Sequence, residues 1–224
     1  MMDIKEIFDN QDIAGAVSWW LGADGDGTDL AGAVEYAVEM HVPILSVAPH
    51  DVPIVWPWVE NLDIKIYPRF ELETMAGNAI SDLAVDINSA FKCGAHGAQI
   101  LCKLNDLERF AESVSVVRND LFFNKDLSIG LDLLEIWPLD WKSVFAALKK
   151  VQATSLLLIL SQDLQEKSDF TGRIYAALEN WDTDSDMELH VMLGTSFSRA
   201  EQVYRLVVAN RPDLVNKLKF FVSY

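Results

Sequence analysis

Short apolar runs alternate with segments of helical periodicity along the whole chain, and this alternation constrains the fold more than any other feature. One unit is especially clear. A glycine-containing loop leads into the apolar run 98–102, Lys103 follows that run, and a segment of helical character opens at Asn105. Glu108, three residues after Asn105, completes the spacing of a capping box at the start of a helix. This unit is typical of a buried strand followed by a helix.

Seven further runs of the same kind bring the expected number of strands to eight. The expected strands are 14–20, 42–48, 64–71, 98–103, 127–133, 156–161, 189–193 and 219–223. Helical periodicity separates most of them, but the segment between 49 and 58 is rich in proline and tryptophan. We expect it to hold little regular helix.

Strands joined by helical crossovers form parallel sheets. Eight such units favour a closed (β/α)8 TIM-type barrel that forms a single domain over residues 1–224. An open doubly wound α/β sheet has the same local pattern and is the alternative. Against it, Gly22, Gly25 and Gly27 do not have the spacing of a dinucleotide-binding loop, and they lie among acidic residues that would repel a pyrophosphate.

The chain stops at its eighth expected strand, so the usual last helix of such a barrel is missing. The outward side chains of this strand, Phe220 and Val222, would then form an exposed apolar face. We expect Ile4, Ile7 and Phe8 to cover that face, or a second subunit to do so. A homo-oligomer is therefore one expected form.

Composition excludes several classes of partner. The 224 residues include 18 Lys and Arg against 34 Asp and Glu, which gives a formal net charge of −16. That balance argues against binding to the phosphates of nucleic acids. No apolar run approaches the ~18 residues of a membrane span, and the N-terminus lacks an apolar signal core. Two cysteines, Cys93 and Cys102, do not make a disulfide framework. We expect a cytoplasmic protein without a membrane partner.

The carboxyl ends of barrel strands carry the chemistry of barrel enzymes. Because side chains alternate along a strand, Lys103 is expected to share the inward face with Leu101, and Asp132 to share it with Gly130. The same alternation, with the loop after the seventh strand, selects further polar or aromatic candidates at this end: Trp20, Arg69, Glu71, Ser161, Thr195, Ser196 and Ser223. It also turns His190 inward near the opposite end, where we expect a structural role.

Two charge pairs have a purely structural explanation as well. Lys103 and Asp132 can form a buried ion pair without catalysis. Arg69 and Glu71, two residues apart on one face, can neutralise each other in the same way.

The chain resembles the Schiff-base aldolase barrels of the transaldolase type at four positions. These are Glu71 on the third strand, Lys103 ending the fourth, Asp132 on the fifth and Ser161 after the sixth. The resemblance implies a small-molecule lyase in which the lysine amine forms an iminium with a carbonyl substrate and carboxylates move the protons. It implies Lys103, Asp132 and Glu71 as catalytic residues and no cofactor.

The chain departs from that family at two places. Transaldolases carry an acid on the first strand and a basic phosphate-binding residue after the sixth. Here Asp24 lies out in the first loop and Arg173 lies far along the chain. The resemblance therefore does not extend to a phosphorylated substrate.

Two other functions remain open. Asp24, His50, Asp51 and Glu71 have the oxygen and nitrogen ligands of a metal-dependent lyase or isomerase. The segment from Asp24 to Asp29 lacks the glycine at the sixth position of a calcium-binding loop, and we assign no metal ligand. The barrel can also serve as a non-catalytic binding or assembly module.

Overall fold

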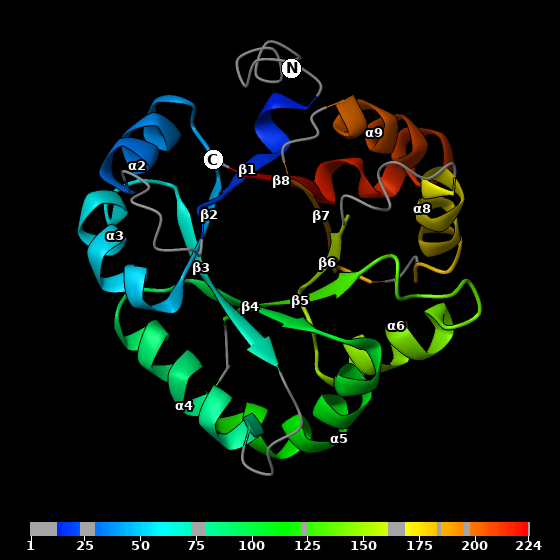
Figure 1. Ribbon diagram of the computed structural model, residues 1–224, viewed down its shortest axis with the longest axis horizontal. Helices are drawn as coiled ribbons and strands as arrows, with labels where there is room; N and C mark the ends of the chain where they lie inside the picture. Colours follow the sequence, from blue (N-terminus) through cyan, green and yellow to red (C-terminus); the bar gives the residue numbers. More distant parts are fainter. Residues whose placement is uncertain are drawn as a thin grey trace.

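A computed structural model describes residues 13–22, 30–72, 79–121, 125–160, 169–182, 185–194 and 198–223. Figure 1 looks down the axis of a closed barrel whose strands follow one another in sequence order, with the helices outside. All neighbouring strands are parallel, and β1 pairs with both β2 and β8. This closure confirms the (β/α)8 barrel and excludes the open sheet.

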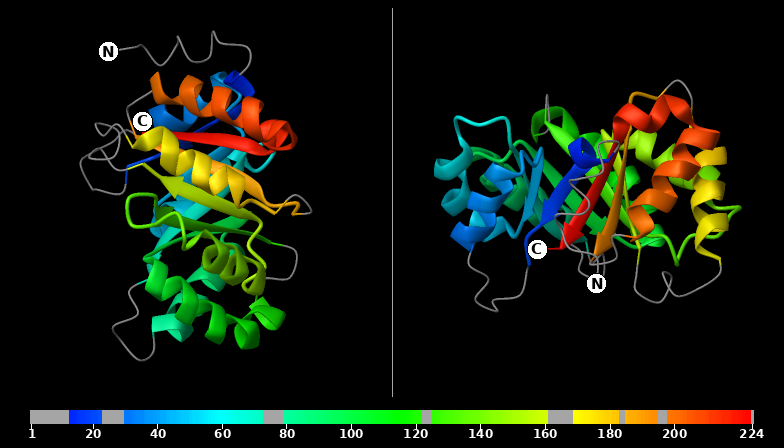
Figure 2. Two further views of the ribbon diagram at one scale, coloured as in Figure 1. Left: turned by 90° about the vertical axis from the view of Figure 1, so that its right-hand side faces the viewer. Right: turned by 90° about the horizontal axis from the view of Figure 1, so that it is seen from above.

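The barrel strands are β1 (Val17–Trp20), β2 (Ile44–Val47), β3 (Lys65–Leu72), β4 (Gly97–Cys102), β5 (Asp126–Asp132), β6 (Ser155–Ile159), β7 (Glu188–Gly194) and β8 (Leu218–Ser223). The α-helices are α2 (Leu30–Glu39), α3 (Val52–Val59), α4 (Ala79–Lys92), α5 (Leu104–Leu121), α6 (Trp141–Lys150), α8 (Phe170–Glu179) and α9 (Ser198–Asn210). Three 3-10 turns complete the described elements: η1 (Ala14–Ala16), η2 (Pro49–Asp51) and η3 (Pro212–Lys217). Figure 2 shows the strands running toward one end of the barrel, so their carboxyl ends share a face.

Side-chain alternation divides the apolar residues into two cores, as expected. The inner core fills the barrel and consists of Ile44, Tyr67, Leu157, Met192 and Phe221, with Trp20, Leu101 and Ile159 packed against them. The larger core lies between the sheet and the helices, and it contains Ile100 and Ile129. Leu101 and Ile100 thus point to opposite sides of the sheet. The expected inward face of β4 is confirmed.

Three local expectations were wrong. Residues 14–16 form the turn η1 rather than the start of β1, because Ala-Gly-Ala has no branched or aromatic side chain that favours a strand. The proline-rich segment does form a helix, α3, since Pro53 lies in its first turn, where no backbone donor is needed. Pro57 inside α3 removes one backbone donor from this short helix.

The third wrong expectation concerns the start of α5. The helix begins at Leu104, one residue before the expected cap, so Asn105 already lies in its first turn. The backbone N–H groups of Asp106 and Leu107 donate to the carbonyl oxygen of Lys103 at 3.0 Å. Lys103 therefore occupies the junction between β4 and α5.

The outer face of β8 is covered within a single chain. Phe220 is fully buried and Val222 is 2% exposed. The turn η1 packs against β8, and Ile13 just before it belongs to the outer core. The predicted cover residues Ile4, Ile7 and Phe8 fall outside the described part of the chain.

None of the helices in the described ranges is long and apolar enough to cross a bilayer.

Candidate functional site

A cavity of about 670 Å³ opens at the carboxyl ends of β3, β4 and β5. Its lining consists of Glu71, Leu72, Leu101, Cys102, Lys103, Asn105, Asp106, Arg109, Asp132, Glu135 and Ile159. This volume lies within the range of small-molecule sites. All three residues predicted to be catalytic, Glu71, Lys103 and Asp132, contribute to it.

Strand register explains why these three residues meet. Leu101 on β4 lies opposite Glu71 on β3 and opposite Gly130 on β5. Lys103 follows Leu101 by two residues, and Asp132 follows Gly130 by two. Because side chains alternate along a strand, both positions face inward like Leu101, nearer to the mouth of the barrel. Gly130 leaves space for the side chain of Leu101, because a Cβ at position 130 would lie 2.5 Å from Cδ2 of Leu101.

Lys103 is exposed at the mouth of the cavity. Across the described residues, no ion pair joins it to Asp132 or to any other acid. The interpretation of Lys103 and Asp132 as a buried ion pair is therefore wrong. Asp132 is half-buried, and its Oδ1 accepts a hydrogen bond of 2.8 Å from the backbone N–H of Leu134. That bond orients the carboxylate at the end of β5.

Arg69 lies apart from the cavity and is only 7% exposed. Its guanidinium donates to the carbonyl oxygen of Ser46 at 2.6 Å and to the carbonyl oxygen of Leu21 at 2.5 Å. The same group lies over the ring of Trp20, 4.5 Å from its centroid. No described ion pair joins Arg69 to Glu71, so their expected mutual neutralisation is not found. Arg69 links the ends of β1, β2 and β3.

Two other predicted substrate-binding residues, Trp20 and Ser223, are described and do not line the cavity. Trp20 packs edge-on against Phe221, with ring centroids 6.4 Å apart, inside the barrel. Ser223 lies beside Trp20 in the register of β1 and β8, and Figure 1 shows β8 across the barrel from β4. Ser161, Thr195 and Ser196 fall outside the described residues.

The candidate metal ligands are dispersed. His50 and Asp51 lie in η2, 3.5 Å apart between Nε2 and Oδ1. His50 lines a separate cavity of about 320 Å³ near α4, whereas Glu71 lines the cavity of Lys103. In the ranges that the structure describes, no three His, Cys, Asp or Glu residues are grouped as a metal site. Asp24 falls outside those ranges.

Sequence reasoning missed the helical wall of the cavity. Asn105, Asp106 and Arg109 come from α5, which begins directly after Lys103. Asp106 and Arg109 are three residues apart and so share one helix face. That spacing is visible in the sequence, but it becomes informative only when the helix is known to start at Leu104.

Cys102 borders the same cavity without offering a nucleophile. Burial, with a smaller effect from Asp106, raises the pKa of its thiol to about 12. The thiol therefore stays protonated at neutral pH.

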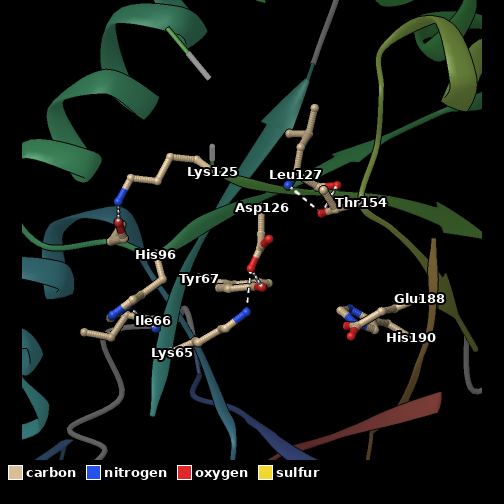
Figure 3. Close-up of polar contacts among 11 residues, drawn as sticks. Lys65, Ile66, Tyr67, His96, Lys125, Asp126, Leu127, Thr154, Glu188 and His190 are labelled. Carbon is tan, nitrogen blue, oxygen red and sulfur yellow. Dashed lines mark hydrogen bonds and ion pairs between the residues drawn. The ribbon is translucent and has the colours of Figure 1, made fainter. Parts of the chain in front are cut away.

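A second polar cluster closes the opposite end of the barrel (Figure 3). Oδ2 of Asp126 accepts hydrogen bonds from Nζ of Lys65 at 2.8 Å and from the hydroxyl of Tyr67 at 2.5 Å. Nε2 of His190 lies 2.9 Å from Oε2 of Glu188. His190 is fully buried at this amino-end face, where barrel residues contribute to stability.

These contacts shift the pKa values of the cluster. Burial alone would raise the pKa of Asp126, but the hydrogen bonds from Lys65 and Tyr67 lower it. The hydrogen bond from His190 lowers the pKa of Glu188. Burial lowers the pKa of His190, although Glu188 opposes that effect. Burial, together with the charge of Asp126, raises the pKa of Tyr67. At neutral pH, both carboxylates are therefore charged and His190 is neutral.

The chain matches no protein-family model and no curated protein. It does resemble solved barrel structures. One, assigned as a deoxyribose-phosphate aldolase of Toxoplasma gondii ME49, is 16% identical, with a TM-score of 0.70 over 98% of this chain and 91% of that one. A tetrameric deoxyribose phosphate aldolase from Aeropyrum pernix is 12% identical, with a TM-score of 0.68 over 99% and 94%.

A third solved structure has a different description. It is a protein assigned to copper homeostasis in Streptococcus agalactiae, 11% identical, with a TM-score of 0.65 over 92% of this chain and 98% of that one. At these identities the similarity shows the fold alone. The fold-level resemblance to aldolase barrels expected from the sequence is confirmed.

Proposed function

We propose that this protein is a lyase of aldolase type that binds a small carbonyl compound through a Schiff base on Lys103. The observation that carries the proposal is the meeting of Lys103, Asp132 and Glu71 in one cavity at the carboxyl ends of three consecutive strands. Barrel enzymes perform their chemistry at this end. Aldolases among the solved structures of the same fold support the proposal.

The first step is attack by the lone pair of Nζ of Lys103, in its uncharged form, on the carbonyl carbon of the substrate. The π electrons of the carbonyl move to its oxygen, which takes up a proton. The resulting carbinolamine loses water after a carboxyl group protonates its hydroxyl. Glu71 and Asp132 both line the cavity, and Glu71 at the exposed end of β3 is assigned this proton donation. The product is a positively charged iminium on Lys103.

The iminium then accepts the electron pair of the neighbouring carbon–carbon bond. Asp132 removes the proton of the hydroxyl group on the carbon that leaves, so that this carbon departs as an aldehyde. The electron pair neutralises the iminium and gives an enamine. Protonation of the enamine carbon and addition of water restore Lys103 and release the second carbonyl product. The bond from Leu134 to Oδ1 holds the Asp132 carboxylate in position for the proton transfer.

Borohydride trapping tests the proposal. The protein is incubated with glyceraldehyde or dihydroxyacetone, reduced, digested and mapped by mass spectrometry. We expect a stable adduct on Lys103 that is lost in Lys103→Met and retained in the control Lys142→Met, which changes an exposed lysine of α6. Labelling of Lys142 and other exposed lysines without preference for Lys103 would contradict the proposal.

A further inference from the structure

The charges on the wall of the cavity restrict the chemical class of substrate, given the proposed function. Four carboxylates line it: Glu71, Asp106, Asp132 and Glu135. Two basic side chains, Lys103 and Arg109, line the same cavity. Lys103 must be uncharged when it attacks a carbonyl. At that step Arg109 is the one cation among the described lining residues, and the excess of acid in the cavity is at its largest.

The place where an anion would most naturally bind is occupied by an acid. The N-terminus of α5 opens onto the cavity directly after Lys103, and a helix N-terminus attracts negative charge. Asp106 lies in the first turn of α5 and supplies that charge from the protein itself. Arg109 lies three residues after Asp106, on the same face of α5, and lines the same cavity. A phosphate entering here would meet the Asp106 carboxylate together with the cation.

Two other arginines near this end of the barrel, Arg69 and Arg173, bind main-chain oxygens. Arg69 donates to the carbonyls of Ser46 and Leu21. Nη1 of Arg173 donates to the carbonyl oxygens of Leu133, Leu134 and Ile136 at distances of 3.0 to 3.1 Å. These guanidinium groups hold the strand ends and the following loop in place. They do not line the cavity of Lys103.

Carboxylates repel anions, and they accept hydrogen bonds from hydroxyl groups. An acid-rich wall also favours the positively charged iminium over the uncharged amine. The net charge of −16 adds a field of the same sign around the molecule. From these features we infer that the substrate is an uncharged, hydroxylated aldehyde or ketone that carries no phosphate group.

Two matched pairs of probes test this inference: glyceraldehyde against glyceraldehyde 3-phosphate, and dihydroxyacetone against dihydroxyacetone phosphate. The measurement is the rate of borohydride-trapped adduct at Lys103 at equal probe concentration. We expect the uncharged member to react at least tenfold faster, which corresponds to about 1.4 kcal/mol. Raising the ionic strength to about 0.5 M is expected to narrow the difference, because salt screens exposed charges.

Two variants locate the source of the discrimination. Asp106→Asn and Glu135→Gln remove acids from the cavity wall, and each is expected to speed the reaction of the phosphorylated probes by several fold. Glu108→Gln is the matched control, since Glu108 is exposed on the same helix but does not line the cavity. It is expected to leave the ratio between the paired probes unchanged.

The outcomes separate this inference from the proposed function. If both members of a pair label Lys103 and the phosphorylated one reacts equally fast or faster, the inference is wrong and the Schiff-base function stands. If no probe labels Lys103 in preference to Lys142, the proposed function fails and the inference falls with it. A ratio that changes as much in Glu108→Gln as in Asp106→Asn would overturn the assignment of the discrimination to the cavity wall.

Discussion

The ring of Tyr67 lies against Gly97 so closely that position 97 has no room for a side chain. A Cβ on Gly97 would lie 2.9 Å from Cε1 of Tyr67 and 2.8 Å from the main-chain oxygen of Asp126. Neither neighbour moves easily, because Tyr67 is 2% exposed and the oxygen belongs to the backbone of β5. Gly97 therefore allows Tyr67 to reach Asp126 inside the barrel.

This contact gives the first prediction. Gly97→Ala should lower the free energy of unfolding by about 1–3 kcal/mol, since an added methyl group overpacks a closed site. Urea denaturation measures the effect. Gly15→Ala is the control, because a Cβ there would meet no atom within 4 Å. Equal stabilities for the two variants would contradict the close packing of Gly97.

The second prediction separates function from folding at Lys103. Lys103 is exposed and joins no described ion pair, so Lys103→Met should change the free energy of unfolding by less than about 0.5 kcal/mol. The same variant should lose the borohydride adduct. A loss of about 3 kcal/mol or more, restored by adding Asp132→Leu, would instead assign Lys103 to a structural ion pair.

The third prediction concerns Arg69. Arg69→Met should lower the free energy of unfolding by about 1–3 kcal/mol, because the carbonyl oxygen of Leu21 loses its charged donor inside the protein. Arg205→Met is the matched control. Arg205 pairs with Glu201 on the surface of α9, where such pairs contribute about 0–1 kcal/mol. Thermal unfolding of both variants gives the comparison, and similar losses would argue against the linking role of Arg69.

The fourth prediction is a loss of stability in acid that comes from the amino-end cluster. The folded protein lowers the pKa of His190 below its usual 6.5, so the unfolded chain takes up this proton first as the pH falls. Stability is then fully present above about pH 6.5 and declines below it. Asp126 and Glu188 have pKa values below their usual 3.8 and 4.5, and their contribution is lost at lower pH still.

Denaturation midpoints between pH 3 and pH 8 measure this dependence. His190→Gln should flatten the decline that begins near pH 6.5 and leave in place the loss below about pH 3.8, because Lys65 and Tyr67 are the main causes of the lowered pKa of Asp126. His50→Gln serves as the control, since the His50 side chain is 76% exposed. A wild-type profile that is level from pH 8 to pH 5 would be inconsistent with a neutral, buried His190.

The sequence was sufficient to predict the barrel and the meeting of Lys103, Asp132 and Glu71. Strand parity needs only the alternation of side chains, and it placed Ile100 outside and Leu101 inside correctly. The parallel order of successive strands then brings their ends to one face. Both arguments depend on local patterns that the rest of the fold does not override.

The parts that failed depend on contacts between distant segments. The partners of Arg69 come from the ends of β1 and β2, and no local pattern indicates that it bonds to the carbonyl of Leu21 rather than to Glu71. His50 and Glu71 line separate cavities, and no local pattern in the sequence indicates that separation. The contribution of Arg109 required the first residue of α5 to be known, and helix boundaries are the least certain result of a sequence pattern.

β3 and β5 each carry one part of the amino-end cluster and one candidate catalytic group. Asp126 begins β5 and Asp132 ends it, and six steps of extended chain place them about 20 Å apart. On β3, Lys65 begins the strand and Glu71, also six steps along, is its last residue but one. Protein engineering can therefore adjust acid tolerance at Asp126 or Lys65 without changing a residue that lines the candidate cavity. The barrel offers two independent points of design on the same pair of strands.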